Sequence, residues 1–355
     1  MPSLALDTRV SGAEGGYRAV VSSDWEVWGP NGGYVAAIAL RAAGAEARIP
    51  RPVAFAAHYL SVARFAPVDL DTRVSGAEGR YRAVVSSDWE VWGPNGGYVA
   101  AIALRAAGAE ARIPRPVAFA AHYLSVARFA PVDLEVTAVH RGRRSESLRV
   151  SMTQEAKPIL EAIVRTAAEL PGLAHDETAP PDVPGPAELA SMEDLHAGQP
   201  TYRFWQNLEG RPVDPGLWRE GRPVRSPVIR QWYRYRPVAR FDDPFVNAAR
   251  ALVLIDTLVW PAVCQRHLAP GFTAPNLDVV AWFHRPALDS EWLLADATAP
   301  IAEGGLVGGT VRIWSVDRRL VASGGAQLLC VPGPGPEPRL IRQPSSTPPT
   351  GTARP

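Results

Sequence analysis

The chain has almost no lysine. Of its 355 residues, 37 are lysine or arginine, and Lys157 is the only lysine. Acidic residues number 36, so the net charge is +1, and no basic surface of the kind that binds nucleic acid is indicated. Cysteine is also scarce. Cys264 and Cys330 have no partners at the spacing of a zinc site or a disulfide framework, so we expect no metal centre.

Long apolar runs are missing as well. No stretch of about 18 apolar residues is free of charge, which excludes an ordinary membrane span. Residues 1–7 lack the charged region and apolar core of a signal peptide. We therefore expect a cytoplasmic protein that has no membrane partner and needs no cofactor. The hydrophobic content of 46% is that of a globular protein, and the length suggests about two domains.

A repeat dominates the N-terminal part. Residues 6–70 recur as residues 70–134, with Gly16 replaced by Arg80 as the interior difference. Two near-identical units do not fit a solenoid, which stacks several diverged units. The first copy breaks off in the middle of a strand, whereas the second continues through it into the rest of a domain. We therefore interpret residues 1–69 as a redundant extra copy of part of the first domain.

The periodicity predicts the same order of elements twice. In the first half we expect a strand at 81–92, an apolar helix at 98–107 capped by Asn95, and strands at 117–126, 132–140, 145–154 and 159–168. In the second half we expect a strand at 229–236, a helix that begins at Pro244 and is kinked or ended by Pro261, and strands at 276–284, 291–298, 305–315 and 320–331.

This order defines the expected fold class. Each half has one strand, one helix that is apolar on nearly every side, and then several antiparallel strands. A curved antiparallel sheet wrapped around a buried helix satisfies that pattern, and the class is α+β. We place the two halves at residues 70–170 and 201–332, joined by a Pro-rich linker at 171–200. Residues 333–355 are predicted to be a disordered tail.

Asp256 is the most informative single residue in the chain, because it interrupts an otherwise apolar segment. From Ala251 to Trp260 the helix has no polar stripe, so it should be buried all round. An unpaired buried carboxylate costs several kcal/mol. Two interpretations remain open. Asp256 is a catalytic carboxylate in an apolar cavity, or it satisfies a nearby backbone group or faces solvent at a helix edge.

Several motifs resemble one known family. They are Trp89-Glu-Val-Trp-Gly-Pro-Asn-Gly-Gly-Tyr98, Arg105-Ala-Ala, His122-Tyr-Leu, Trp282-Phe-His-Arg-Pro286, Glu291-Trp-Leu-Leu294 and Leu320-Val-Ala-Ser323. In this order they resemble the acyl-CoA thioesterase II (TesB-like) double-hotdog proteins, over residues 70–332. The resemblance implies two hotdog folds in one chain and hydrolysis of acyl-CoA by direct attack of water. It also implies an acyl-CoA substrate, and we expect a homo-oligomer.

The resemblance also implies catalytic residues. The family holds the water with an Asp on the second hotdog helix, a hydroxyl residue before the Trp-Phe-His-Arg-Pro strand, and a Gln on the last strand. Asp256 matches the first position, and Asn276 stands where the family has Thr or Ser. Gln327 falls four residues after Ser323, where the family spacing is three. A bulge at Gly324-Gly325 restores its direction; without one, Gln327 faces the wrong side of the sheet.

Gly96, Gly97 and Tyr98 begin the first helix, and we assign them to substrate binding. Free amides there suit a developing oxyanion, and glycines allow a ligand to approach the backbone. Tight helix packing explains the two glycines equally well. Arg105, Arg141, Arg143 and Arg144 are candidates for the CoA phosphates or are solvated surface charges.

Two other functions compete with acyl-CoA hydrolysis. One is a catalytically weak hotdog protein that binds acyl-CoA or acyl groups as an accessory protein or sensor. The altered positions at Asn276 and Gln327 favour it. The other is a hotdog hydratase or dehydratase, which needs an Asp/His pair, but the first His after Asp256 is His267. A serine nucleophile is disfavoured because the chain has no Gly-x-Ser-x-Gly elbow.

Overall fold

The computed structural model describes residues 70–196, 201–216, 221–268 and 271–332, together with residues 11–13, 16–19 and 38. Contacts divide the chain into two units, Met1–Val68 and Asp69–Pro355. In the first unit, β1 (Ser11–Ala13) and β2 (Gly16–Arg18) form an antiparallel hairpin in which Ser11 pairs with Arg18. The corresponding residues of the second copy, Ser75 and Arg82, pair in the same register. The repeated sequence thus forms the same hairpin in both units.

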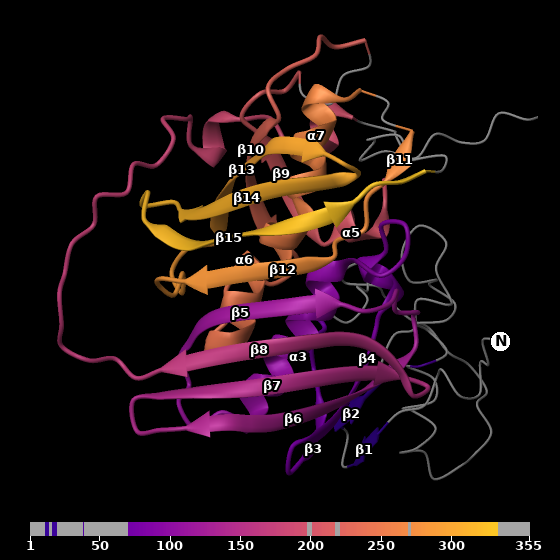
Figure 1. Ribbon diagram of the computed structural model, residues 1–355, viewed down its shortest axis with the longest axis vertical. Coiled ribbons are helices and arrows are strands. Elements are labelled where there is room, and N and C mark those ends of the chain that lie inside the picture. Colours follow the sequence, from indigo (N-terminus) through magenta and orange to yellow (C-terminus); the bar gives the residue numbers. More distant parts are fainter. Residues whose placement is uncertain are drawn as a thin grey trace, which may run out of the picture. The chain divides into compact units, whose positions relative to one another are not determined.

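The second unit is built on one 12-stranded sheet, in the order β3-β4-β6-β7-β8-β5-β12-β15-β14-β13-β10-β9 (Figure 1). All neighbouring strands in it are antiparallel. The first half contributes β3 (Ser75–Ala77), β4 (Arg80–Val84), β5 (Pro116–Tyr123), β6 (Pro131–Arg141), β7 (Ser145–Gln154) and β8 (Lys157–Ala167). The second half contributes β9 (Leu208–Pro212), β10 (Val228–Tyr235), β12 (Asp278–Phe283), β13 (Trp292–Glu303), β14 (Leu306–Ser315) and β15 (Leu320–Leu329).

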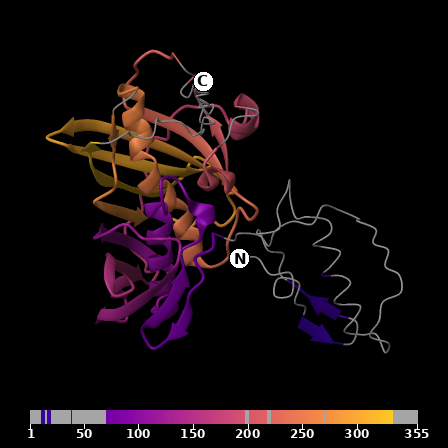
Figure 2. The same ribbon diagram turned by 90° about the vertical axis from the view of Figure 1, so that its right-hand side faces the viewer.

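The two halves are joined where β5 pairs with β12, with Ala120 opposite Val280. Each half places its long helix against its own strands: α3 (Gly96–Glu110) contacts β5 to β8, and α6 (Pro244–Thr257) contacts β12 to β15. Both helices lie on the same side of the sheet (Figures 1 and 2). The predicted α+β class, with a curved antiparallel sheet over a buried helix in each half, is confirmed.

Helix α3 begins as its sequence predicts. The side chain of Asn95 accepts a hydrogen bond from the backbone N–H of Tyr98 at 2.9 Å and caps the helix. A Cβ at Gly97 would lie 2.8 Å from Cα of Val253, and one at Gly108 would lie 2.5 Å from the ring of Phe245. The helices therefore pack closely and run antiparallel, because the start of α3 meets the end of α6 and the end of α3 meets its start.

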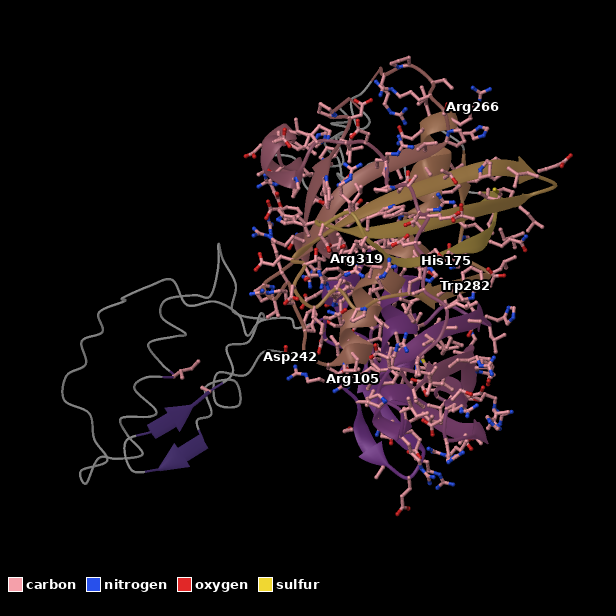
Figure 3. The ribbon with its side chains drawn as sticks, turned by 90° about the vertical axis from the view of Figure 1, so that its left-hand side faces the viewer. Arg105, His175, Asp242, Arg266, Trp282 and Arg319 are labelled. Atoms are coloured by element: carbon pink, nitrogen blue, oxygen red, sulfur yellow. The ribbon has the colours of Figure 1, made fainter. Side chains whose placement is uncertain are left out.

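Helix α6 is capped by Asp243, whose side chain accepts hydrogen bonds from the N–H groups of Phe245 and Val246. Arg105 of α3 forms an ion pair with Asp243, beside the labelled Asp242 (Figure 3). The helix ends at Thr257 because Pro261 has no N–H to donate to the Thr257 carbonyl. A second helix, α7 (Val259–Arg266), follows at once.

Together α6 and α7 form an apolar stretch of 23 residues, Pro244–Arg266, with the length and composition of a membrane span. Within the part of the chain that the structure describes, it is the single such stretch. Of its most hydrophobic window, 83% is buried inside the protein. This is the behaviour of a core helix, which needs no polar stripe because protein surrounds it on every side.

The structure differs from the predicted elements in several places. The strand expected at 81–92 ends at Val84, and a short 3₁₀ turn, Ser87–Trp89, follows with Ser86 as its cap. This turn carries the fully buried Trp89 into the core. Strand β9 was not expected, and helix α4 (Met192–Leu195) lies in the segment assigned to a linker. Residues 171–185 contain no helix or strand (Figure 1). The predicted tail, 333–355, lies outside the described residues.

Candidate active site

Asp256 lies in the last turn of α6 and is 4% exposed. Its side chain lines a cavity of about 520 Å³. The cavity is bounded by the loop before α3, the end of β5, helices α6 and α7, and the segment before β12. The walls are mainly apolar, and they include Trp92, Leu124, Ile159, Trp205 and Trp260. A largely apolar cavity with a few convergent polar groups is the usual form of a small-molecule site.

The carboxylate of Asp256 receives hydrogen bonds from several neighbours. The hydroxyl of Tyr123 donates to its Oδ1 at 2.7 Å, and Nδ2 of Asn276 donates to the same oxygen at 2.7 Å. Nδ2 of Asn276 also reaches the backbone oxygen of Asp256 at 2.9 Å. The backbone N–H of Gly97 donates to the carboxylate as well. These donors come from β5, the segment before β12 and α3, so both halves of the sheet build the site.

These surroundings shift the acidity of the carboxyl group. Burial raises the pKa of Asp256 to about 6, while the hydrogen bonds from Tyr123, Asn276 and Gly97 act in the opposite direction. Such a carboxyl group is largely ionised at neutral pH and still basic enough to take a proton there. Burial, and then the negative charge of Asp256, raise the pKa of Tyr123 well above its ordinary value. Tyr123 therefore stays protonated and remains a donor.

Asn276 is held in place by backbone contacts with strand β15. It forms an isolated antiparallel bridge with Leu328 of β15, and the N–H of Leu277 donates to the Gln327 carbonyl at 2.7 Å. The backbone on either side of Asn276 is thereby fixed, and its amide points to Asp256. The structure brings together the two residues that the sequence singled out, Asp256 and Asn276.

Gln327 is not brought to this site. Pairing between β14 and β15 continues without a shift from Gln327 to Ala322, and the irregularity comes later, between Ala322 and Leu320. Gly324 and Gly325 thus form no bulge. The side chain of Gln327 is exposed on the outer face of the sheet, while its neighbour Ala326 is buried. The expected water contact from Gln327 must be corrected, because the register points its side chain away from the helices.

Gly96 and Gly97 allow neighbouring protein atoms to pack closely against the start of α3, and they do not form an open groove for a ligand. A Cβ at Gly97 would meet backbone and Cβ atoms of α6 within 2.9 Å. A Cβ at Gly96 would lie 3.0 Å from Oδ2 of Asp256 and 3.3 Å from Cζ of Tyr123. Gly97 is therefore required for helix packing. Gly96 lines the cavity and leaves room for the hydrogen-bonded Asp256 and Tyr123 side chains.

Tyr98 is a core residue in this structure. Its ring is fully buried and stacks on Trp89 with 5.0 Å between ring centroids. Its hydroxyl donates to the Asp71 carbonyl at 2.9 Å. Tyr98 is absent from the residues that line the cavity. The assignment of Tyr98 to substrate binding is therefore corrected: its neighbours fix the entry into α3.

Tyr123 was missed as a site residue, although its motif, His122-Tyr-Leu, had been recognised. Periodicity places it in a strand but does not show that its hydroxyl reaches a helix in the other half. The aromatic walls of the cavity were missed as well. Among them are Trp92 and Trp260, whose rings pack edge to face with 6.5 Å between their centroids. Strand ends and the loop before a helix give no periodic signal that marks them as cavity walls.

Two of the arginines considered for CoA phosphates are engaged elsewhere. Arg105 pairs with Asp243, and Arg141 pairs with Glu110 and Glu146. His284 lies 2.8 Å from the Ser323 hydroxyl through Nε2, and burial lowers its pKa. Among the described residues, no group of three or more His, Cys, Asp or Glu side chains is placed to hold a metal ion.

The fold and this cavity define a class, the double hotdog with one carboxylate-centred site. Solved structures of the same fold include a hot-dog protein of unknown function from Alicyclobacillus acidocaldarius (22% identity, TM-score 0.64, covering 74% of this chain and 97% of that one). An acyl-CoA thioesterase II from Mycobacterium marinum is similar at 21% identity and TM-score 0.62, covering 74% and 98%. A putative thioesterase II from Thermobifida fusca is similar at 21% identity and TM-score 0.63, covering 74% of this chain and 97% of that one.

Family models assign the chain more closely. The acyl-CoA thioesterase C-terminal domain matches residues 178–331, and the N-terminal domain matches residues 21–83 and again 85–167. The two N-terminal matches begin at equivalent places in the two copies, Val21 and Val85. The chain belongs to the acyl-CoA thioesterase family and is a thioesterase. The family that the sequence motifs predicted is thereby confirmed.

Proposed function

We propose that this protein hydrolyses acyl-CoA thioesters to free acid and CoA, with Asp256 orienting and deprotonating the attacking water. The observation that carries the proposal is the position of Asp256. Among the described residues that line the cavity it is the one carboxylate, and it is held by Tyr123, Asn276 and Gly97. A basic group in a largely apolar cavity is suited to activate water.

The reaction follows from this placement. The water oxygen attacks the thioester carbonyl carbon while Asp256 accepts one of its protons. The tetrahedral intermediate then collapses, the carbon–sulfur bond breaks, and the CoA sulfur leaves as a thiolate that recovers a proton. The start of α3, at Asn95 and Gly96, borders the same cavity. The positive end of this helix stabilises the negative oxygen of the intermediate.

The apolar walls provide for the acyl group. Leu124, Val126 and Ile159 line the cavity with the rings of Trp92 and Trp260. Burying methylene groups against such a surface contributes roughly 0.8 kcal/mol per group. The size of about 520 Å³ lies within the usual range for small-molecule sites. Binding of the acyl chain is thus separated from the polar corner where the water is held.

The test is release of free CoA from a series of acyl-CoAs, short to long, by the wild-type protein and by Asp256→Asn. General-base catalysis contributes typically 10²- to 10⁴-fold, so we expect turnover to fall by at least about 100-fold with acyl-CoA binding retained. Asp296→Asn is the matched control, because Asp296 forms an ion pair with Arg230 and does not line the cavity.

Two outcomes would contradict the proposal. A folded wild type that binds acyl-CoA without releasing CoA would identify an accessory acyl-binding protein. Equal turnover by wild type and Asp256→Asn would show that another group activates the water. Calorimetric binding of a non-hydrolysable thioether analogue separates these results from a failure to bind substrate.

A further inference from the structure

We propose that Tyr123 is the positioning residue of this site: its hydroxyl holds Oδ1 of Asp256, directs Oδ2 to the water, and sets the acidity of the base. The inference rests on the proposed function of Asp256. It assigns a role to a residue of the first half, whereas the carboxylate itself belongs to the second half.

The backbone of Tyr123 is anchored at the joint between the halves. Tyr123 is the last residue of β5, and its N–H donates to the Leu277 carbonyl at 2.9 Å. Leu277 directly follows Asn276. The two side-chain donors to Asp256 thus lie on adjoining segments, the end of β5 and the residues before β12. A movement of either segment changes the hydrogen bonds of the carboxylate.

The donors also make the two carboxylate oxygens unequal. Tyr123 and Asn276 both donate to Oδ1, each at 2.7 Å. A Cβ at Gly96 would lie 3.0 Å from Oδ2 and 3.2 Å from Oδ1, so both oxygens lie close to this cavity-lining glycine. Because neither side chain donates to Oδ2, we assign Oδ2 to the water. Tyr123 thereby selects the oxygen that accepts the proton.

The last strand provides no comparable polar group. The inward position there is the buried Ala326, whose methyl group forms no hydrogen bond, and Gln327 points outward. Tyr123 lines the cavity and contacts Asp256 directly. Its hydroxyl is therefore one of the two side-chain groups that stabilise the ionised carboxylate, beside the Asn276 amide.

The effect on acidity has a definite sign. Asp256 is faced by the Tyr123 hydroxyl from β5, the Asn276 amide from the segment before β12, and the Gly97 N–H from α3. The other titratable groups that line the cavity are Tyr202 and Cys264. Each hydrogen bond to the carboxylate favours its ionised form. Removal of the Tyr123 hydroxyl therefore raises the pKa of Asp256. It lowers kcat/KM most at low pH, where more of the carboxyl group is then protonated.

The experiment is the pH dependence of kcat/KM for Tyr123→Phe in the full-length protein. A hydrogen bond to a charged group contributes about 1.5 kcal/mol or more, so the acidic limb should move upward by about one pH unit. Tyr81→Phe is the matched control. The Tyr81 hydroxyl donates to Oε2 of Glu110 at 2.9 Å, and neither residue lines the cavity. We expect no movement of the limb in that variant.

The outcomes are separable from those of the proposed function. A uniform loss at all pH values, or a limb that coincides with that of wild type, would overturn the role of Tyr123. A wild type without hydrolysis would instead overturn the proposed function. The titration of the Asp256 carboxyl carbon by NMR, in wild type and Tyr123→Phe, still reports on the hydrogen bond in that case. Thermal unfolding of both variants identifies any loss of folded protein.

Discussion

The hydroxyl of Tyr123 and Oδ1 of Asp256 lie 2.7 Å apart and connect the two halves of the protein. Tyr123 ends a strand of the first half, and Asp256 ends a helix of the second. The buried carboxylate and one of its hydrogen-bond donors therefore come from different hotdogs. Neither half contains the complete cluster, so the cluster depends on the pairing of β5 with β12.

Asp256 should make the stability of the protein depend on pH. Burial raises its pKa to about 6 in the folded state, from the ordinary 3.8 of an aspartate. The folded protein thus holds the proton more tightly. The resulting stabilisation is full below about pH 4 and is lost as the pH rises through about 6. A difference of about two units between the folded and unfolded pKa corresponds to about 3 kcal/mol in the free energy of unfolding.

The check is urea unfolding of wild type and Asp256→Asn at pH 4.5 and pH 7.5. We expect the variant to gain stability relative to wild type at the higher pH, since its amide oxygen accepts the hydrogen bonds from Tyr123 and Asn276 without a buried charge. Equal pH dependence in the two proteins would show that Asp256 titrates normally.

Neighbouring glycines should respond differently to alanine. A Cβ at Gly97 would lie 2.8 Å from Cα of Val253, which cannot move without separating the helices. Gly97→Ala should therefore lose about 1–3 kcal/mol of stability. A Cβ at Gly96 meets the ends of the Asp256 and Tyr123 side chains at 3.0–3.3 Å. Gly96→Ala should lose about tenfold or more in kcat with little loss of stability.

Gly172→Ala is the control for both, since a Cβ at Gly172 would have nothing within 4 Å and Gly172 does not line the cavity. Melting temperature and kcat are measured for all three variants. A Gly96→Ala protein that unfolds early, or a Gly97→Ala protein as stable as wild type, would contradict the assigned contacts.

Gln327 should be dispensable for turnover. Its side chain is exposed on the outer face of the sheet, and it is absent from the cavity wall. Exposed substitutions change stability by about 0.5 kcal/mol or less, so kcat/KM of Gln327→Ala should remain within about twofold of wild type. A large loss of kcat would mean that β15 pairs in another register during catalysis.

Deletion of residues 6–69 should preserve the enzyme. The deletion joins Ala5 to Leu70 and leaves every later residue unchanged. The 12-stranded sheet and the three polar side chains of the site all lie in the unit Asp69–Pro355. We expect the same melting temperature and kcat/KM as the full chain. Insoluble or less stable protein would show that the first copy has a structural role.

The sequence alone predicted much of this fold, because hydrophobic alternation marks strands and unbroken apolar helices must be buried. Strand β7 has the predicted bounds, and α6 begins at the predicted Pro244. The same logic found Asp256, since a carboxylate conflicts with its apolar helix. Asn276 required the family resemblance, because a lone Asn before a strand carries no periodic signal.

The remaining site residues depended on register, which local sequence does not determine. Gly324 and Gly325 offered a bulge, but they serve close strand contact: their Cβ atoms would lie 2.0 Å from the Val280 oxygen and 2.2 Å from the Gly309 oxygen. The irregularity falls beside Ala322 instead, and Gln327 turns outward. Tyr123 required knowledge of which strand end meets α6, a contact between residues 133 positions apart.

The antiparallel packing of α3 against α6 has a consequence for stoichiometry. The strand order is symmetric about the β5–β12 pair, so the end of α3 is the counterpart of the end of α6, where Asp256 lies. At that counterpart Gly108 receives the Phe245 ring, and Arg105 is paired with Asp243. In the described residues this place is filled by packing and an ion pair. An active-site titration should therefore count one reactive centre per polypeptide, which is half the number that two equivalent hotdogs would supply.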